Sequence, residues 1–188
     1  MAHRKTAVLI HGCHLQANLN GQNWESIAFG SEDGTSVTLE GRAVMGIKVA
    51  LDSVAAVVIF STGASERSGV KEAQYTFNHA QARIEVIAQA VGHPAARVER
   101  LLRQQVDLDL VSQNTYEECQ RTFERCREWN VEQIIFVSSP WHIQRCLTEG
   151  LKVANEMRQN GHRVPEVQAT ASYGPVEGVV VLEPSHRG

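Results

Sequence analysis

The sequence predicts a three-layer α/β domain in which a mainly parallel sheet of about five strands has helices on both faces. Continuous apolar runs of strand length recur along the chain, as in residues 55–60 (AAVVIF). Such runs are typical of strands buried on both faces of a parallel sheet. Segments with the apolar periodicity of a helix separate them, which favours a Rossmann-like arrangement. The 188 residues suffice for one well-buried domain, expected over 1–188.

The N-terminal half alternates strand and helix. Thr6–Ile10 is an apolar run of strand length, and it leads into a polar, irregular stretch over 15–35 that we expect to be a binding loop or lid. Apolar residues at helical spacing predict a helix over about 36–53, and Ala55–Phe60 is the second strand. One apolar helical face then extends over 70–91 until a glycine and a proline break it, which predicts one long helix.

The C-terminal half continues the alternation with a short helix, a strand, a helix, a strand, a long helix and two final strands. Ser139 is a plausible N-cap for the long helix, and Pro140 suits its first position. The expected helices are Ala95–Arg103, one after Thr115 whose apolar stripe is Tyr116, Cys119, Phe123 and Cys126, and the long helix that ends at about residue 160. The expected strands are Val106–Leu110, Ile134–Val137, Val167–Ser172 and Val176–Leu182, and a tail follows at 183–188.

The composition of the chain argues against some classes of binding partner, namely nucleic acids and membranes. The net charge of −3 gives no global basic field, which argues against nucleic acid as a partner. No apolar stretch reaches the roughly 18–20 residues that span a bilayer, so we expect no membrane partner. The four cysteines include no CxxC pair, and Cys119, Cys126 and Cys146 fall on apolar helical stripes. These features predict a cytoplasmic protein and leave its oligomeric state open.

Polar residues cluster where the predicted strands end. They follow the first strand at His11–His14, the second at Ser61–Glu66, the third at Ser112–Thr115 and the fourth at Ser138–His142. Because ligands bind outside the carboxyl ends of strands in such sheets, this convergence predicts one site. His142 and Arg145 lie on one face near the start of a helix, where backbone N–H groups and the macrodipole favour an anion.

Four motifs, taken in order from about Val8 to Cys146, resemble the ElyC/SanA/YdcF family of Rossmann-like proteins. They are a first strand ending in glycine; Thr62–Gly63–Ala64 followed by Lys71–Glu72–Ala73; Asn114–Thr115–Tyr116–Glu117–Glu118; and Ser138–Ser139–Pro140–Trp141–His142–Ile143–Gln144–Arg145–Cys146. Ala64, Lys71 and Glu118 stand where the family pattern has glycine, serine and asparagine. The resemblance implies binding of nucleotide-like ligands or a role in lipid-carrier metabolism.

Position and resemblance together give the candidate site. The expected catalytic residues are Glu72, as acid or base, and His142, as proton or hydrogen-bond donor, with Arg145 as an anion clamp. The expected substrate-binding residues are Gly12, His14, Thr62, Gly63, Ser65, Asn114, Thr115, Ser138, Ser139 and Arg145. Each also has a purely structural interpretation: Glu72 suits a helix start, and Asn114 or Thr115 suits a capping box with Glu117 or Glu118.

The sequence carries no strong signature of a metal or dinucleotide cofactor. His11, Cys13 and His14 invite a metal site or a Cys–His nucleophile, but no HExxH or CxxC motif supports a metal, so none is expected. The Ser61–Ser65 loop is a possible backbone cradle for phosphate, although it matches neither GxxxxGK[ST] nor GxGxxG. The absence of a GxSxG elbow disfavours a serine esterase.

The sequence therefore predicts a cytoplasmic enzyme, a hydrolase or transferase, that acts on an anionic, phosphorylated or nucleotide-like small metabolite at the C-terminal edge of the sheet. A non-catalytic nucleotide- or S-adenosylmethionine-binding module is the first alternative. The second is a tailoring enzyme of specialised metabolism, in which the stretch over 15–35 selects the substrate.

Overall fold

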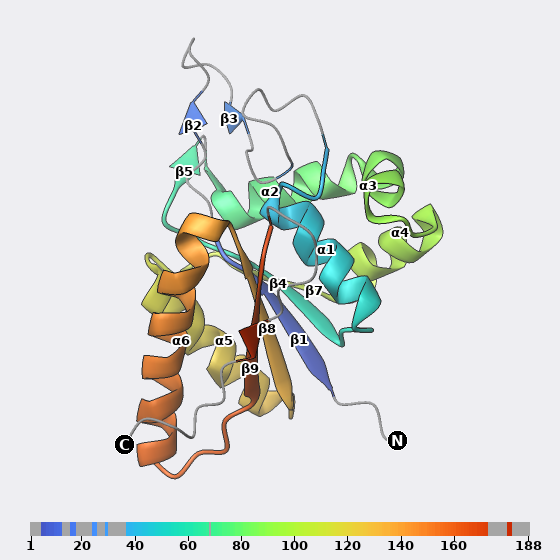
Figure 1. Ribbon diagram of the computed structural model, residues 1–188. Helices are drawn as coiled ribbons and strands as arrows, with labels where there is room; N and C mark the ends of the chain where they lie inside the picture. Colours follow the sequence, from blue (N-terminus) through green and yellow to red (C-terminus); the bar gives the residue numbers. More distant parts are fainter. Residues whose placement is uncertain are drawn as a thin grey trace.

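A six-stranded sheet forms the centre of the computed structural model, which describes residues 5–12, 16–17, 24–25, 29, 37–67, 69–172 and 180–181 (Figure 1). Its five parallel strands are β1 (Thr6–Ile10), β4 (Val57–Ser61), β7 (Val106–Asp109), β8 (Gln133–Ser138) and β9 (Glu166–Ala171). The short β10 (Val180–Val181) pairs antiparallel with β9 at one edge. The predicted α/β class and mainly parallel sheet are confirmed.

The strand order places β1 in the middle of the sheet. The order is β10-β9-β8-β1-β4-β7, so the chain moves outward from β1 through β4 to β7 and then returns to lay β8 on the other side of β1. Strand order therefore reverses between β1 and β8. In open α/β sheets this switch point opens a crevice at the carboxyl ends of the strands.

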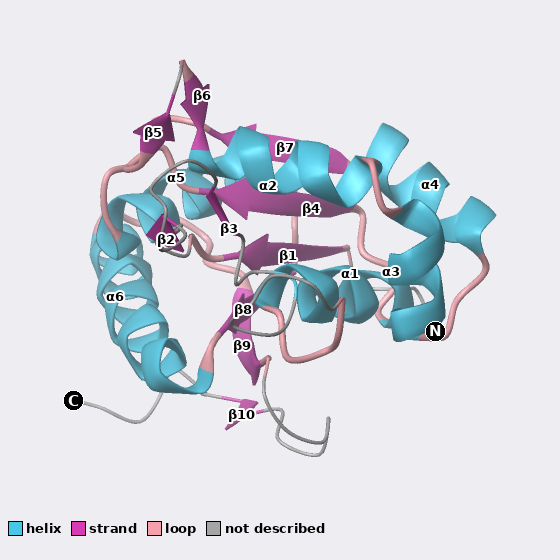
Figure 2. Ribbon diagram, turned by 90° about the horizontal axis from the view of Figure 1, so that it is seen from above, coloured by secondary structure: helices cyan, strands magenta, loops and turns pink. Residues whose placement is uncertain are grey.

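Helices cover both faces of the sheet (Figures 1 and 2). One face carries α1 (Arg42–Asp52), α2 (Glu72–Gln81), α3 (Ile84–Val91) and α4 (Ala95–Gln104), and the other carries α5 (Thr115–Glu128) and α6 (Pro140–Gln159). Alternate residues of β1 divide between the two cores, with Val8 and Ile10 on the first face and Ala7 and Leu9 on the second.

The predicted single helix over 70–91 is wrong. The structure ends α2 at Gln81 and begins α3 at Ile84, with Ala82 and Arg83 as a turn between them. The break redirects the chain, so that α2 packs on β4 while the apolar face of α3 packs against α1 and α4. The apolar period continues across the turn because both helices lie on the same core.

Two short hairpins were not predicted, and the second includes Val70 and Lys71, which were expected to begin the helix over 70–91. Within 15–35, β2 (Gln16–Ala17) pairs antiparallel with β3 (Trp24–Glu25). Apart from Phe29, the rest of that stretch lies outside the described residues, as does the predicted tail at 183–188. After β4, β5 (Glu66–Arg67) pairs with β6 (Val70–Lys71). Within the described ranges, no helix has the length and hydrophobicity needed to cross a bilayer.

Candidate functional site

Arg42 joins the ends of β1 and β8 at the switch point. It is the first residue of α1, and its guanidinium is buried, with the residue only 6% exposed. Nη1 donates to the carbonyl oxygens of His11, at 3.3 Å, and Gly12, while Nη2 donates to the Ser139 hydroxyl at 2.5 Å. No carboxylate among the described residues forms an ion pair with Arg42, so its positive charge remains uncompensated at this edge.

The start of α6 lies beside Arg42. Ser139 holds the N-cap position and Pro140 the first helical position, as predicted, but the Ser139 hydroxyl bonds Arg42 instead of capping the helix. His142 is half-buried in the first turn, and its Nε2 lies 3.5 Å from Thr115 Oγ1. Arg145, in contrast, is exposed on α6. The structure thus brings His142 together with Thr115 and leaves Arg145 at the surface.

Beneath this edge, His11 contacts a buried carboxylate. The His11 Nδ1 lies 2.7 Å from Glu118 Oε2, and the Gly12 amide donates to Glu118 Oε1 at 3.4 Å. The His11 ring also makes edge contacts with the rings of Phe136 and His142, at centroid distances of 5.1 and 6.4 Å. Glu118 therefore serves as the partner of His11 and not as a capping-box residue.

The Cys146 thiol completes this buried group. Burial alone would lower the pKa of His11, but the charges of Cys146 and Glu118 and their hydrogen bonds outweigh it and raise that pKa. Burial alone would likewise raise the pKa of Cys146, but His11 and then His142 outweigh it and lower that pKa. For both groups the charge of the partner opposes the effect of burial and determines the direction of the pKa shift.

The loop after β4 packs against the residues that follow β7. The amides of Gly63 and Ala64, at the centre of this loop, are not free to bind an anion. The Gly63 amide donates to the Ser112 carbonyl at 2.9 Å, and the Ala64 amide donates to Thr62 Oγ1 at 3.2 Å. A Cβ on Gly63 would lie 2.2 Å from the Leu110 carbonyl oxygen, so only glycine fits. The proposed phosphate cradle is wrong for these two amides, because both are already bonded.

Asp109, at the end of β7, interacts with residues of β4, of the loop after β7 and of α5. Its buried carboxylate accepts hydrogen bonds from the amides of Val111 and Ser112, both at 3.1 Å, and from the Ser112 hydroxyl. It also accepts from the Ser61 hydroxyl at 3.3 Å and lies 3.5 Å from Arg121 Nε. The ends of β4 and β7 and the helix α5 are therefore tied through one side chain.

Two predicted site residues start helices. Glu72 is buried in the first turn of α2, and its amide donates to the Ser65 carbonyl at 3.0 Å. Asn114 caps α5: its Oδ1 accepts from the Glu117 amide at 3.0 Å, and its Nδ2 donates to Glu117 Oε1 at 2.7 Å. Both polar atoms of the exposed Asn114 side chain are thus used by the cap.

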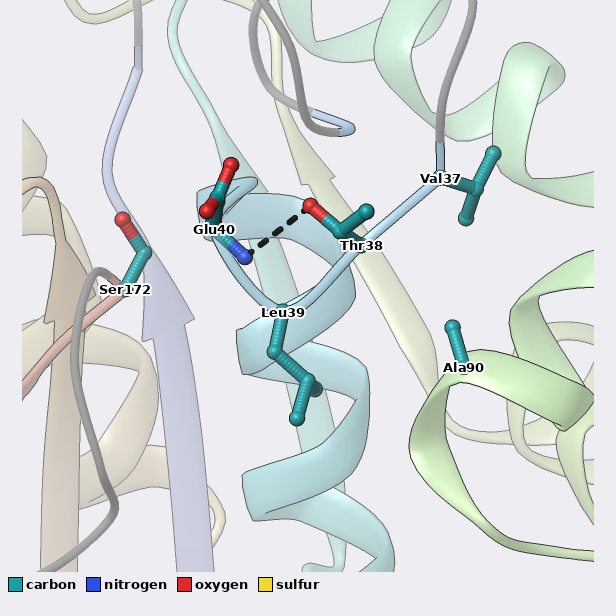
Figure 3. A pocket seen from close by; sticks show the side chains of 6 residues that line it. All are labelled: Val37, Thr38, Leu39, Glu40, Ala90 and Ser172. Atoms are coloured by element: carbon teal, nitrogen blue, oxygen red, sulfur yellow. Dashed lines mark hydrogen bonds between the residues drawn. The ribbon is translucent and has the colours of Figure 1, made fainter.

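A pocket of about 420 Å³ lies on the same edge (Figure 3). Val37–Glu40, just before α1, form one side, and Ala90 of α3 and Ser172 at the end of β9 complete it. The Ser172 amide donates to the Ser138 carbonyl at 2.8 Å, so the pocket adjoins the end of β8. The hydroxyl oxygens of Ser138 and Ser172 are buried and without a hydrogen-bond partner among the described residues. The Glu40 carboxylate makes this pocket unsuited to an anion.

Only some of the predicted site residues lie together at the switch point. Gly12, Thr62, Thr115, Ser138, Ser139 and His142 lie at the adjoining ends of β1, β4 and β8 and the helices that follow. His14 and Cys13 lie outside the described residues. Neither Arg42 nor the role of Cys146 was predicted from the sequence. The only indications of these two residues in the sequence were an arginine at a helix start and a cysteine one helical turn after His142.

Within the described part of the chain, no group of three or more His, Cys, Asp or Glu side chains is arranged to hold a metal ion. When the chain is compared with protein-family models, with curated proteins and with solved structures, none of them matches. The resemblance to the ElyC/SanA/YdcF family and the cytoplasmic location therefore stay predictions.

Proposed function

We propose that this chain is an enzyme that acts on an anionic, phosphorylated or nucleotide-like small metabolite, by hydrolysis or group transfer, at the C-terminal edge of the sheet. The observation that carries the proposal is the uncompensated guanidinium of Arg42 at the switch point, beside the half-buried His142. A buried positive charge without a carboxylate partner is costly unless an anion offsets it.

The start of α6 supports the same ligand chemistry. Its macrodipole adds positive potential at its first turn, where Arg42 already contacts Ser139. His142 Nε2 lies 3.5 Å from Thr115 Oγ1, so the ring is placed at the start of α6, where an imidazole can donate to a ligand oxygen. In this role His142 donates a proton or a hydrogen bond to the leaving group, and Glu72 acts as acid or base.

The adjoining pocket supports a ligand that has an uncharged part as well as an anionic group. The phosphate lies near Arg42, and the pocket takes the remainder of the molecule. Glu40 is two residues from Arg42 and offers an acceptor for sugar hydroxyls, although it repels phosphate. This division favours a nucleotide-like metabolite over inorganic phosphate.

A thermal-shift screen with inorganic phosphate, adenosine and adenosine monophosphate tests the proposal. We expect the monophosphate to raise the melting temperature most and adenosine least; a ligand at 100 times its Kd adds about 2.7 kcal/mol. His142→Gln should reduce the shift. The matched control His162→Gln, at an exposed histidine beyond the end of α6, should not.

Two results would contradict the proposal. A melting temperature insensitive to every phosphate compound excludes the anion site. A shift that survives His142→Gln places binding elsewhere. Binding with no product after long incubation favours the non-catalytic nucleotide- or S-adenosylmethionine-binding module, which the same geometry supports.

A further inference from the structure

A second pocket lies at the edge of the sheet opposite the switch point. Its volume is about 160 Å³, and its walls come from the end of α1, from α4 and from the segment before β4. The Ala56 amide donates to the carbonyl of Thr6, the first residue of β1, and the Val58 amide donates to the carbonyl of Gln105, directly before β7. The pocket therefore adjoins the amino ends of these strands. It is too small for a nucleotide, because pockets for ligands of that size have volumes of about 300–1,000 Å³.

Two arginines of α4 line this pocket. Arg97 and Arg100 are three residues apart and so lie on one face of the helix. Arg97 Nη2 donates to the Leu51 carbonyl at 2.8 Å, and its Nη1 lies 3.2 Å from His93 Nδ1, so two neutral groups hold this guanidinium in place. Arg100 is exposed, and its guanidinium makes no hydrogen bond or ion pair within the described part of the chain. One arginine is therefore fixed in position and the other is free to pair with a ligand.

The neighbouring carboxylates already have partners. The two oxygens of Asp52 lie 2.5 Å from Lys48 Nζ and 2.7 Å from His93 Nε2. Glu99 pairs with Arg103 at 2.8 Å. No carboxylate among the described residues lines the pocket itself. The positive charges of its two guanidiniums are therefore uncompensated there.

Val54, which also lines the pocket, is an unusual residue for its backbone position. The amides of Val54 and Ala55 donate to the carbonyls of Leu51 and Ala50, at 3.4 and 2.9 Å, in a Schellman-type end to α1. Val54 has a φ of 51°, in the left-handed region that glycine normally occupies in this motif and that strains a β-branched residue. It is also 65% exposed, so burial in the core does not explain a valine here. Strained residues of this kind concentrate at ligand sites.

We propose that this pocket binds a small carboxylate that carries a short aliphatic chain. The carboxylate pairs with Arg100 and with Arg97, since a guanidinium presents N–H groups that match the two carboxylate oxygens. Apart from the two arginines and Gln105, every residue that lines the pocket is apolar, so the aliphatic chain packs against residues such as Val54 and Leu101. This site shares no residue with the switch point, and it does not rest on the function proposed above.

The test is a titration of the full chain with sodium butyrate at constant ionic strength, followed through the NMR chemical shifts of the backbone amides. We expect saturable changes at the amides of Val54, Ala55 and Gln105. Butyramide has the shape of butyrate without its charge and should leave these amides unchanged at the same concentrations. Acetate keeps the charge but lacks two methylene groups, so it should bind roughly fivefold to tenfold more weakly than butyrate.

Two variants test the residues that line the pocket. Arg100→Gln should weaken butyrate binding by at least about tenfold, because the charge-assisted hydrogen bonds are lost. The control Arg103→Gln, on the same helix and paired with Glu99, should leave the affinity unchanged. Val54→Gly suits the left-handed backbone, so it should keep the melting temperature while weakening butyrate by about threefold or more. Loss of binding at an unchanged melting temperature separates the effect on the site from an effect on folding.

Several outcomes would overturn the proposal. The first two, an absence of saturable changes at these amides or an equal response to butyramide, require no variant to fold. Undiminished butyrate affinity in folded Arg100→Gln protein would also overturn it, and undiminished affinity in Val54→Gly would remove Val54 from the site. His142→Gln should bind butyrate as the wild type does. A loss of butyrate binding in that variant would place the carboxylate at the switch point and exclude a separate site.

Discussion

The Arg42 guanidinium donates a hydrogen bond of 2.5 Å to the Ser139 hydroxyl and so ties the first residue of α1 to the N-cap residue of α6 across the switch point. The same guanidinium bonds the carbonyls that follow β1. One side chain therefore both fixes the crevice and supplies its positive charge. The structural role and the proposed ligand-binding role therefore fall on the same residue.

Replacing Arg42 should lower stability as well as ligand affinity. Arg42→Met leaves buried carbonyl oxygens without a donor, and we expect a loss of about 2–3 kcal/mol in the free energy of unfolding. The control Arg103→Met removes an exposed arginine paired with Glu99 on α4 and should change that energy by less than about 0.5 kcal/mol. Urea unfolding measures both; equal losses would show that the Arg42 bonds do not stabilise the fold.

Substitution of Glu72 tests its role as acid or base. Once the screen has provided a substrate, Glu72→Gln should lower kcat by roughly 10²-fold or more while changing Kd little, because the amide keeps the shape and loses the proton transfer. Glu85→Gln is the matched control, since Glu85 also lies in the first turn of a helix, α3, but is exposed. Undiminished turnover in folded Glu72→Gln protein would remove Glu72 from the mechanism.

Asn114 offers a test that separates capping from ligand contact. Asn114→Ala should cost about 1 kcal/mol of stability, because the Glu117 amide loses its acceptor. Asn114→Asp keeps that acceptor and should recover most of the stability. If capping is the whole role, the aspartate variant also keeps wild-type affinity for the monophosphate. A clear loss of affinity at restored stability would instead show that Asn114 contacts the ligand, as the sequence predicts.

His79 should make the protein sensitive to mild acid. Burial, followed by the charge of Arg83, lowers the pKa of His79 to about 4, and its ring lies 4.5 Å from that of Phe29. In the unfolded chain this histidine takes up a proton near pH 6.5. Between pH 6.5 and 4 the unfolded state therefore binds more protons, so stability falls as the pH falls through this window.

His79→Gln should remove that part of the acid sensitivity. The unfolding free energy of the variant should decline less than that of the wild type between pH 7 and pH 4, measured by urea unfolding at several pH values. His162→Gln, at an exposed position, should follow the wild-type curve. Parallel curves for wild type and His79→Gln would contradict the assignment.

The fold was predictable because its strands are short and apolar and its helices are periodic. Thr6–Ile10 coincides with β1, and the other parallel strands differ from their predicted bounds by only a few residues. The break between α2 and α3 was not predictable. Ala82 and Arg83 are good helix formers, and only packing against α1 and α4 ends the helix there.

The sequence predicted where the candidate site would lie, but it did not predict which side chains would contact one another there. Strand ends show where polar loops meet, which correctly placed Ser139 and His142 near the switch point. The partner of a side chain depends on tertiary contacts across long stretches of sequence. Cys146 matches an apolar helical stripe and is indeed in the core. Burial alone would raise the pKa of its thiol, yet the charge of His11 lowers it, and no pattern in the sequence indicates that partner.

The Asp109 carboxylate has a mechanical consequence for this crevice. The carboxylate accepts hydrogen bonds from the ends of β4 and β7 and lies beside Arg121 of α5. We therefore expect the ends of β4 and β7 and the helix α5 to move together as one rigid body. A widening that admitted a ligand would then come from the opposite side, where the Arg42–Ser139 hydrogen bond joins α1 to the start of α6. Hydrogen exchange that is slow at Ser112 and faster at the start of α6 would be the signature of such a one-sided hinge.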